Sequence, residues 1–316
     1  MRNNNSWILD CILANFTHWK PKPVEDALRK VLEEATSNDS EKAREAGREA
    51  PLPRTQAGLI ISVFYPSSKR KAGVPVADWI YYSGIPGILL QLGISVIPGV
   101  ILGEWNLLLI TGAGILLALA TAALPQWRIE KWGCRRTEKT VILTFGNGAQ
   151  HALVIIGDKH FLDLEALAVA RPTWSRLSLF CTTVLALLWI VHLIIVLGIT
   201  ASPWYLLAIG GIGMLHNIMV AVLPRRPEAL GLPLEFRKCI ANRKAMEALK
   251  EVEIEYPGVG LAMISTFFPG ALREDEEKWW KSKRGRTAGV TQDAAAIPGV
   301  CEAKNRSNHQ TERTLV

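Results

Sequence analysis

Four long apolar stretches divide the chain into alternating apolar and polar parts. They cover residues 80–103, 107–124, 177–199 and 204–223, and none contains Asp, Glu, Lys or Arg. A helix needs about 20 apolar residues to cross a bilayer core, and it satisfies its own backbone hydrogen bonds in lipid. Helices buried in a soluble core seldom stay free of charge over such lengths. The pattern therefore predicts a membrane all-α fold, a bundle of four transmembrane helices.

The distribution of basic residues predicts the orientation of these helices. All 36 Lys and Arg residues lie outside the four stretches: 12 before the first, 8 between the second and third, and 16 after the fourth. The short turns 104–106 and 200–203 carry one acid and no base. The positive-inside rule then places both termini and the loop 125–176 in the cytoplasm. It does not choose between an endomembrane and the plasma membrane.

Aromatic residues at the ends of the apolar stretches agree with this arrangement. Trp79, Tyr81 and Tyr82 open the first stretch, and Trp204 and Tyr205 open the fourth. Amphipathic rings favour the headgroup level of a bilayer. We interpret these residues as interfacial anchors.

The remaining sequence falls into four cytoplasmic segments around the two membrane pairs, 80–124 and 177–223. We expect an N-terminal segment over 1–79, a loop over 125–176, a helical region over 224–280 and a disordered basic tail over 281–316. The first 20 residues carry apolar side chains near helical spacing but include Asp10. They are too short to span, and either lie on the membrane surface, pack on protein or stay mobile.

A small cytoplasmic α+β unit is predicted from three separate pieces of chain. Residues 59–65 are β-branched and aromatic and end at a proline, which is typical of a strand. Residues 140–145 and 149–156 form two strand-like runs around Gly146-Asn147-Gly148, a composition that suits a tight hairpin. Helices are expected over 24–35 and 242–255. Because an isolated hairpin is marginal in water, we expect the first strand and the second helix to cover it.

Composition excludes several function classes. The chain of 316 residues is 49% hydrophobic with a net charge of +7, and its five cysteines lie far apart, so neither a disulfide scaffold nor a zinc cluster is indicated. Gly146-Asn147-Gly148 lacks the Gly-Lys-Ser/Thr ending of a phosphate-binding loop. No nucleophile elbow, paired carboxylates or zinc-protease motif is present. The sequence predicts no catalytic residue, cofactor or metal, and it favours a function without enzymatic activity.

One polar cluster in the middle loop could still hold a hard cation. Asp158, His160, Asp163 and Glu165 are metal-compatible side chains close together in the sequence. They have no recognised loop spacing. A helix that starts near Asp163 is the preferred interpretation.

Polar residues inside the apolar stretches are candidate functional residues because they are costly in a membrane. His192 in the third stretch and His216 with Asn217 in the fourth qualify. At 1.5 Å per residue the histidines are staggered by about 8 Å, which is compatible with a shared water or ligand. The alternative is that each one bonds a neighbouring helix as part of packing.

Several strings of sequence resemble a group of uncharacterised multi-pass membrane proteins of filamentous fungi. The strings occupy residues 78–84, 124–128, 131–136, 146–151, 210–217 and 224–229. The resemblance extends from Asp78 to Trp280. It implies a eukaryotic endomembrane or plasma membrane location and carries no activity or catalytic residue with it.

Two hypotheses of function follow. The first is a membrane-anchored adaptor or scaffold with a cytoplasmic interaction unit. The second is a membrane-embedded enzyme or carrier for a lipophilic small molecule, accessory to fungal secondary metabolism, which depends on His192, His216 and Asn217. The expected partners are the lipid bilayer and a cytoplasmic protein, with a homo-oligomer through helix packing as a further option and no nucleic acid.

Overall fold

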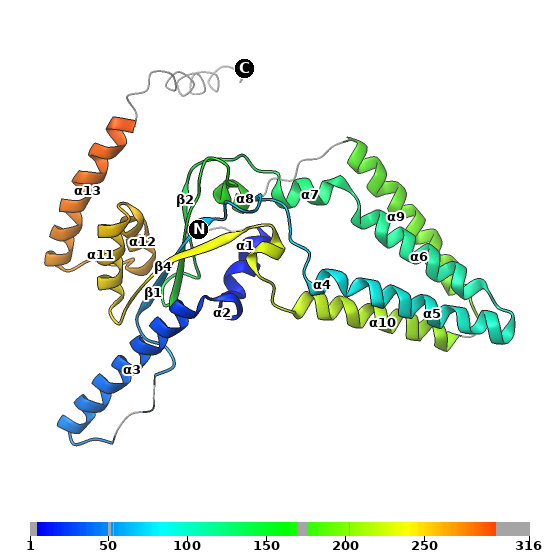
Figure 1. Cartoon of the computed structure of the whole chain (residues 1–316), viewed down its shortest axis with the longest axis horizontal. Helices are drawn as coiled ribbons and strands as arrows, with labels where there is room; N and C mark the ends of the chain where they lie inside the picture. The colour runs from blue at the N-terminus through cyan, green and yellow to red at the C-terminus, as the bar shows by residue number, and fades with distance from the viewer. Residues whose placement is uncertain (1–4, 50–51, 53, 170–175, 202, 295–316) are drawn as a thin grey trace, which may run out of the picture.

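The computed structural model describes residues 5–49, 52, 54–169, 176–201 and 203–294. It has two parts: a sheet unit and an arm of apolar helices that extends from one side of it (Figure 1). The apolar arm consists of α4 (Trp79–Tyr82), α5 (Gly84–Leu102), α6 (Asn106–Ala122), α9 (Arg176–Leu197) and α10 (Pro203–Val222). The short helix α7 (Pro125–Trp132) connects α6 back to the sheet unit.

Four strands from three pieces of chain form one mixed sheet. The strands are β1 (Leu59–Pro66), β2 (Thr140–Thr144), β3 (His151–Ile156) and β4 (Leu234–Asn242), in the order β2-β3-β1-β4. β1 pairs parallel with β3 and antiparallel with β4, and β2 pairs antiparallel with β3. The predicted strand and hairpin, and the prediction that distant segments assemble into an α+β unit, are confirmed.

One face of the sheet is covered by helices from the C-terminal part of the chain. α11 (Ala245–Glu255) and α12 (Val259–Phe267) pack on Leu59, Ile61 and Val63 of β1. α13 (Glu274–Ala294) adds Trp280, whose indole N–H donates to the Met246 sulfur of α11 at 3.4 Å. The predicted helix over 242–255 is therefore present, and its apolar side covers the sheet.

The other face is covered by the N-terminal helices and by α8 (Leu164–Val169). In α1 (Trp7–Ala14) and α2 (Phe16–Trp19), the side chains of Ile8, Ile12 and Phe16 are buried against the sheet. Three arrangements were expected for the first 20 residues. The described residues of this segment adopt one of them, packing on protein. Because both faces are covered, β1 is buried almost throughout, and this explains its apolar run, which only Ser62 interrupts.

The structure supports membrane insertion through the apolar arm. Three helical stretches are long and apolar enough to cross a bilayer, namely Trp79–Leu102, Arg176–Leu197 and Pro203–Val222. A fourth crossing exists if α6 and α7, which meet at 41°, form one broken span. The predicted span 107–124 is too long, because α6 ends at Ala122. Pro125, which favours an extended residue before it, then begins α7.

The apolar helices, for which a four-helix transmembrane bundle was predicted, form an open row. The main contacts join α10 to α5, α5 to α6 and α6 to α9. Figure 1 shows the pairs α5–α10 and α6–α9 meeting at the far end of the arm and diverging towards the sheet. No described residue of α9 is buried. These helices are apolar on all sides. Lipid solvates such surfaces as well as a protein core does, so the hydrophobic effect does not drive the helices to pack around a common core.

Two further predictions of chain organisation were wrong. The region 224–280 is not entirely helical, since it contains β4 and the 3₁₀ turn Pro227–Leu230. The expected disordered tail does not begin at residue 281, because α13 continues to Ala294. Residues 295–316 lie outside the described part of the chain. The expected helix over 24–35 is present as the longer α3 (Lys22–Glu45).

Candidate functional site at the base of the apolar arm

An ion pair joins the two ends of the apolar arm where they meet the sheet unit. Asp78 precedes α4 and Arg225 follows α10, and their side chains are about four-fifths buried, with 23% and 22% exposed. The Arg225 Nε donates to Asp78 Oδ2 at 2.8 Å and its Nη2 donates to Oδ1 at 2.7 Å. Such two-pronged contacts fix geometry as well as charge.

Asp78 has a second role as the cap of α4. Its Oδ1 accepts the Tyr81 backbone N–H at 2.8 Å, which satisfies a donor that the first helical turn leaves free. Burial alone would raise the pKa of the Asp78 carboxyl, but the hydrogen bonds from Arg225 and Tyr81 outweigh burial and lower this pKa below its usual 3.8. Asp78 is therefore a carboxylate at neutral pH.

His216, one of the predicted intramembrane residues, lies in α10 and contacts Ser83. Its Nε2 is 3.0 Å from the Ser83 hydroxyl oxygen, at the junction of α4 and α5. Ser83 donates its only hydroxyl proton to the Ile80 carbonyl at 2.7 Å. The hydroxyl must therefore accept from His216, which requires the proton on Nε2.

His192 lies on the other helix pair. Its Nε2 is 3.0 Å from the position that a Cβ on Gly114 of α6 would occupy, so the histidine fills the space left by that glycine. Its ring stacks edge-on with Trp189, whose indole N–H donates to Thr121 Oγ1 at 3.2 Å. His192 thus contributes to the contact between α9 and α6.

The structure does not bring the three predicted residues together. His192 packs on α6, His216 bonds the α4–α5 junction, and Asn217 is exposed on α10. The two histidines have different neighbours in the row of helices, which agrees with packing roles. The sequence analysis did not identify Asp78, Ser83 and Arg225 as candidate residues. An acid just before the first apolar stretch and a base just after the last one could have indicated the Asp78–Arg225 ion pair.

A cavity of about 320 Å³ opens beside the Asp78–Arg225 pair. Its walls include the first residue of α4 and the residues that follow α10, and three arginines and two acids line it. The lining residues are Arg70, Val76, Asp78, Trp79, Ile80, Pro224, Arg225, Arg226, Glu228 and Ala229.

The polar cluster of the middle loop has a structural role. Asp163 Oδ1 accepts the backbone N–H groups of Glu165 and Ala166, both at 3.1 Å, and Oδ2 accepts from Arg135 Nε at 2.8 Å. Asp163 is thus the cap of α8, as the preferred interpretation required. Among the described residues no three metal-compatible side chains form a group that could hold an ion.

The Gly146-Asn147-Gly148 segment forms the hairpin turn between β2 and β3. Gly146 and Gly148 have φ angles of 103° and 84°, a region that favours glycine. The prediction of a hairpin turn is confirmed.

Comparisons with protein-family models, with curated proteins and with solved structures found no match. The relation to a fungal membrane-protein family stays a prediction.

Proposed function

We propose that this chain is a membrane-anchored adaptor or scaffold. In this proposal four helices cross the bilayer, both termini face the cytoplasm, and the sheet unit binds a protein partner at the membrane surface. The observation that carries the proposal is the way the sheet alternates with the apolar helices along the chain.

The order of the strands in the sheet supports a topology in which each apolar pair returns the chain to the same side. β1 precedes α4 and α5, β2 and β3 lie between α6 and α9, and β4 follows α10. These strands are hydrogen-bonded neighbours, so in a membrane-spanning chain an even number of crossings between them is the arrangement that agrees with the sheet. The basic residues all belong to this side, which supports a cytoplasmic position. The folded unit is therefore tied to the bilayer at four points of the chain.

α3 offers the sheet unit a surface for a partner. It extends away from the sheet (Figure 1), and only Val24, Val31 and Ala35 of its 24 residues are buried. A groove of about 800 Å³ follows it. Acids and bases line this groove, among them Glu25, Arg29 and Glu33 of α3 and Arg54 from outside the helix. Mixed charge at fixed spacing favours recognition of a polar peptide segment over an apolar ligand.

Native mass spectrometry of the full-length protein, extracted gently from its own membrane, tests this function. The variant Arg29→Glu with Glu33→Arg exchanges the two charges in the groove and leaves the net charge unchanged. The control, Lys42→Glu with Glu45→Lys, makes the same exchange at the end of α3, where both side chains are exposed. We expect a protein partner that the wild type and the control retain and the groove variant loses. A partner retained equally by all three, or none in any, contradicts the proposal.

The alternative function is an enzyme or carrier for a lipophilic small molecule within the membrane. It has weaker support, because His192 and His216 belong to different helix pairs. A small molecule bound to a lone chain, lost on alanine replacement of His192, His216 or Asn217, would favour it.

A further inference from the structure

The cavity beside Asp78 and Arg225 contains two arginines without a described partner. Arg225 forms an ion pair with Asp78 and neutralises the charge of that carboxylate. Arg70 and Arg226 are exposed, and among the described residues no hydrogen bond or ion pair involves either guanidinium. Glu228 is the remaining acid in the lining, so the cavity keeps a net positive charge after the Asp78–Arg225 pair is counted.

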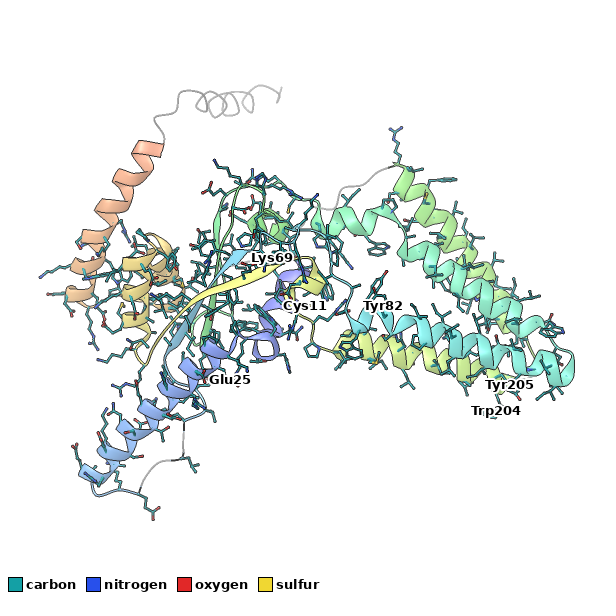
Figure 2. All side chains as sticks on the ribbon, viewed as in Figure 1. Cys11, Glu25, Lys69, Tyr82, Trp204 and Tyr205 are labelled. Atoms are coloured by element: carbon teal, nitrogen blue, oxygen red, sulfur yellow. The ribbon has the colours of Figure 1, made fainter. Side chains whose placement is uncertain are left out.

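The position of the cavity relates these arginines to the membrane surface. Its walls include Trp79, the first residue of the first apolar helix, and Pro224, which comes shortly after the last one. The Trp79 side chain is 63% exposed, as expected of a ring at the headgroup level. Figure 2 shows Tyr82 near this base and Trp204 with Tyr205 at the opposite end of the arm, so aromatic residues mark both ends of the apolar helices.

A phosphate group matches this arrangement. Guanidinium groups bind phosphate oxygens through paired N–H donors, and a low-dielectric wall strengthens the attraction. The neighbouring Lys69 and Lys71 extend the basic surface around Arg70. Anionic phospholipids place their phosphates at the depth where the apolar helices leave the sheet unit.

We propose that the cavity is a binding site for a phosphate group, held by Arg70 and Arg226 beside the Asp78–Arg225 pair. The membrane source of this group is an anionic phospholipid, and the soluble source is free phosphate or a phosphorylated metabolite. The lipid source rests on the proposed membrane position of the arm, whereas the phosphate site itself does not.

The test measures lipid retention by the full-length protein in nanodiscs of phosphatidylcholine with a small fraction of phosphatidylglycerol. The variant Arg70→Gln with Arg226→Gln removes both free guanidiniums. The control Arg44→Gln with Arg48→Gln removes two exposed arginines near the far end of α3. Native mass spectrometry counts the phosphatidylglycerol molecules kept on the released protein. We expect the control to match the wild type and the cavity variant to bind about 5-fold more weakly for each arginine removed.

A conservative variant and a competition experiment complete the test. Arg70→Lys with Arg226→Lys keeps the charge but loses the paired donors, and we expect it to recover only part of the binding. Added inorganic phosphate that leaves the lipid in place assigns the membrane source. Inorganic phosphate that binds the wild type in lipid-free detergent, but not the Gln variant, assigns the soluble source. If the Gln variant binds phosphatidylglycerol and inorganic phosphate as strongly as the control does, the proposed site is wrong.

Discussion

The carboxylate of Asp78 and the guanidinium of Arg225, 147 residues apart in the chain, form a two-pronged ion pair that closes the apolar arm at its base. Asp78 precedes the first apolar helix and Arg225 follows the last. The pair therefore joins the entrance and the exit of the arm, in addition to the long-range contact between α5 and α10. Breaking it should loosen the arm from the sheet unit without unfolding either part.

A double-mutant cycle measures this contact. Asp78→Asn keeps an acceptor for the Tyr81 N–H and removes the charge, and Arg225→Gln removes the other partner. We expect each single variant to lower the free energy of unfolding by about 1–2 kcal/mol, since each leaves a partly buried charge without its partner. The double variant should cost less than the sum of the two. Additive effects in denaturant titrations of the detergent-solubilised protein would show that the two side chains act independently.

The α6–α9 contact depends on the absence of a side chain at Gly114. A valine there would occupy the position of the His192 ring, which is 3.0 Å from the Cβ site, so Gly114→Val should separate the two helices and lower the thermal midpoint by several degrees. Gly112→Val has the same backbone cost, but no atom lies within 4 Å of its Cβ site. Equal midpoints for the two variants would mean that the contact adds no stability.

Acid should weaken the sheet unit at Asp163. Burial would raise the pKa of this carboxyl, but the Arg135 hydrogen bond and the Ala166 N–H outweigh burial and lower this pKa below 3.8. A carboxyl with a lowered pKa in the folded state stabilises the fold above its unfolded pKa, and this contribution disappears as pH falls from about 4 through the folded value. Asp163→Asn should be less stable than wild type at pH 7, and the difference should shrink below pH 4. A difference that stays constant from pH 7 to pH 3 contradicts this role.

Trp280 should hold α13 against the sheet unit. Its side chain is 2% exposed and contacts Met246, whereas Trp279 is half-buried and lies beside Lys250. Trp280→Ala removes a buried ring worth about 3–5 kcal/mol of local stability. We expect faster protease cleavage at α13, with β1 and β3 still protected from hydrogen exchange. Trp279→Ala should change cleavage much less.

The proposed orientation can be tested with single introduced cysteines in sealed membrane vesicles of known sidedness. Ala201→Cys places a thiol in the turn between α9 and α10, and Ser68→Cys places one beside the sheet; both positions are exposed. A membrane-impermeant thiol reagent added to the cytoplasmic face should label the Ser68→Cys variant above the background of the native cysteines and leave the Ala201→Cys variant at that background. The opposite result reverses the orientation, and labelling of both variants excludes the three crossings, or any odd number, between the two positions.

The sequence predicted the strands whose pattern is simple and missed the one whose pattern is interrupted. β1 is apolar except for Ser62 up to its final proline, and the β2–β3 turn has its glycines at positive φ. In β4, Leu234, Phe236, Cys239 and Ala241 pack against the same core. Cys239 comes three residues after Phe236, whereas a regular strand would have a spacing of two. A bulge opposite Val63 and Phe64 causes this shift, and it hides the two-residue alternation.

The base of the arm was missed for a different reason. The candidate functional residues were the polar residues within the apolar stretches. Asp78 and Arg225 lie just outside these stretches. Their pairing depends on the order of the helices in space, which the apolar pattern does not encode because every side of each helix is equally apolar. The same reason explains why the apolar pattern predicted a four-helix bundle but not its open arrangement in a row.

The alternation of strands and apolar pairs also sets the order of events during synthesis. β1 emerges from the ribosome before both of its neighbours, and β4 emerges only after α10. At 5–20 residues per second, the nascent β1 waits roughly 10–35 s for its second partner. In the proposed topology, a chain in which either pair of apolar helices fails to insert leaves β1 without one of its neighbouring strands, and a bare apolar strand edge favours aggregation. Completion of the sheet would therefore require insertion of both helix pairs.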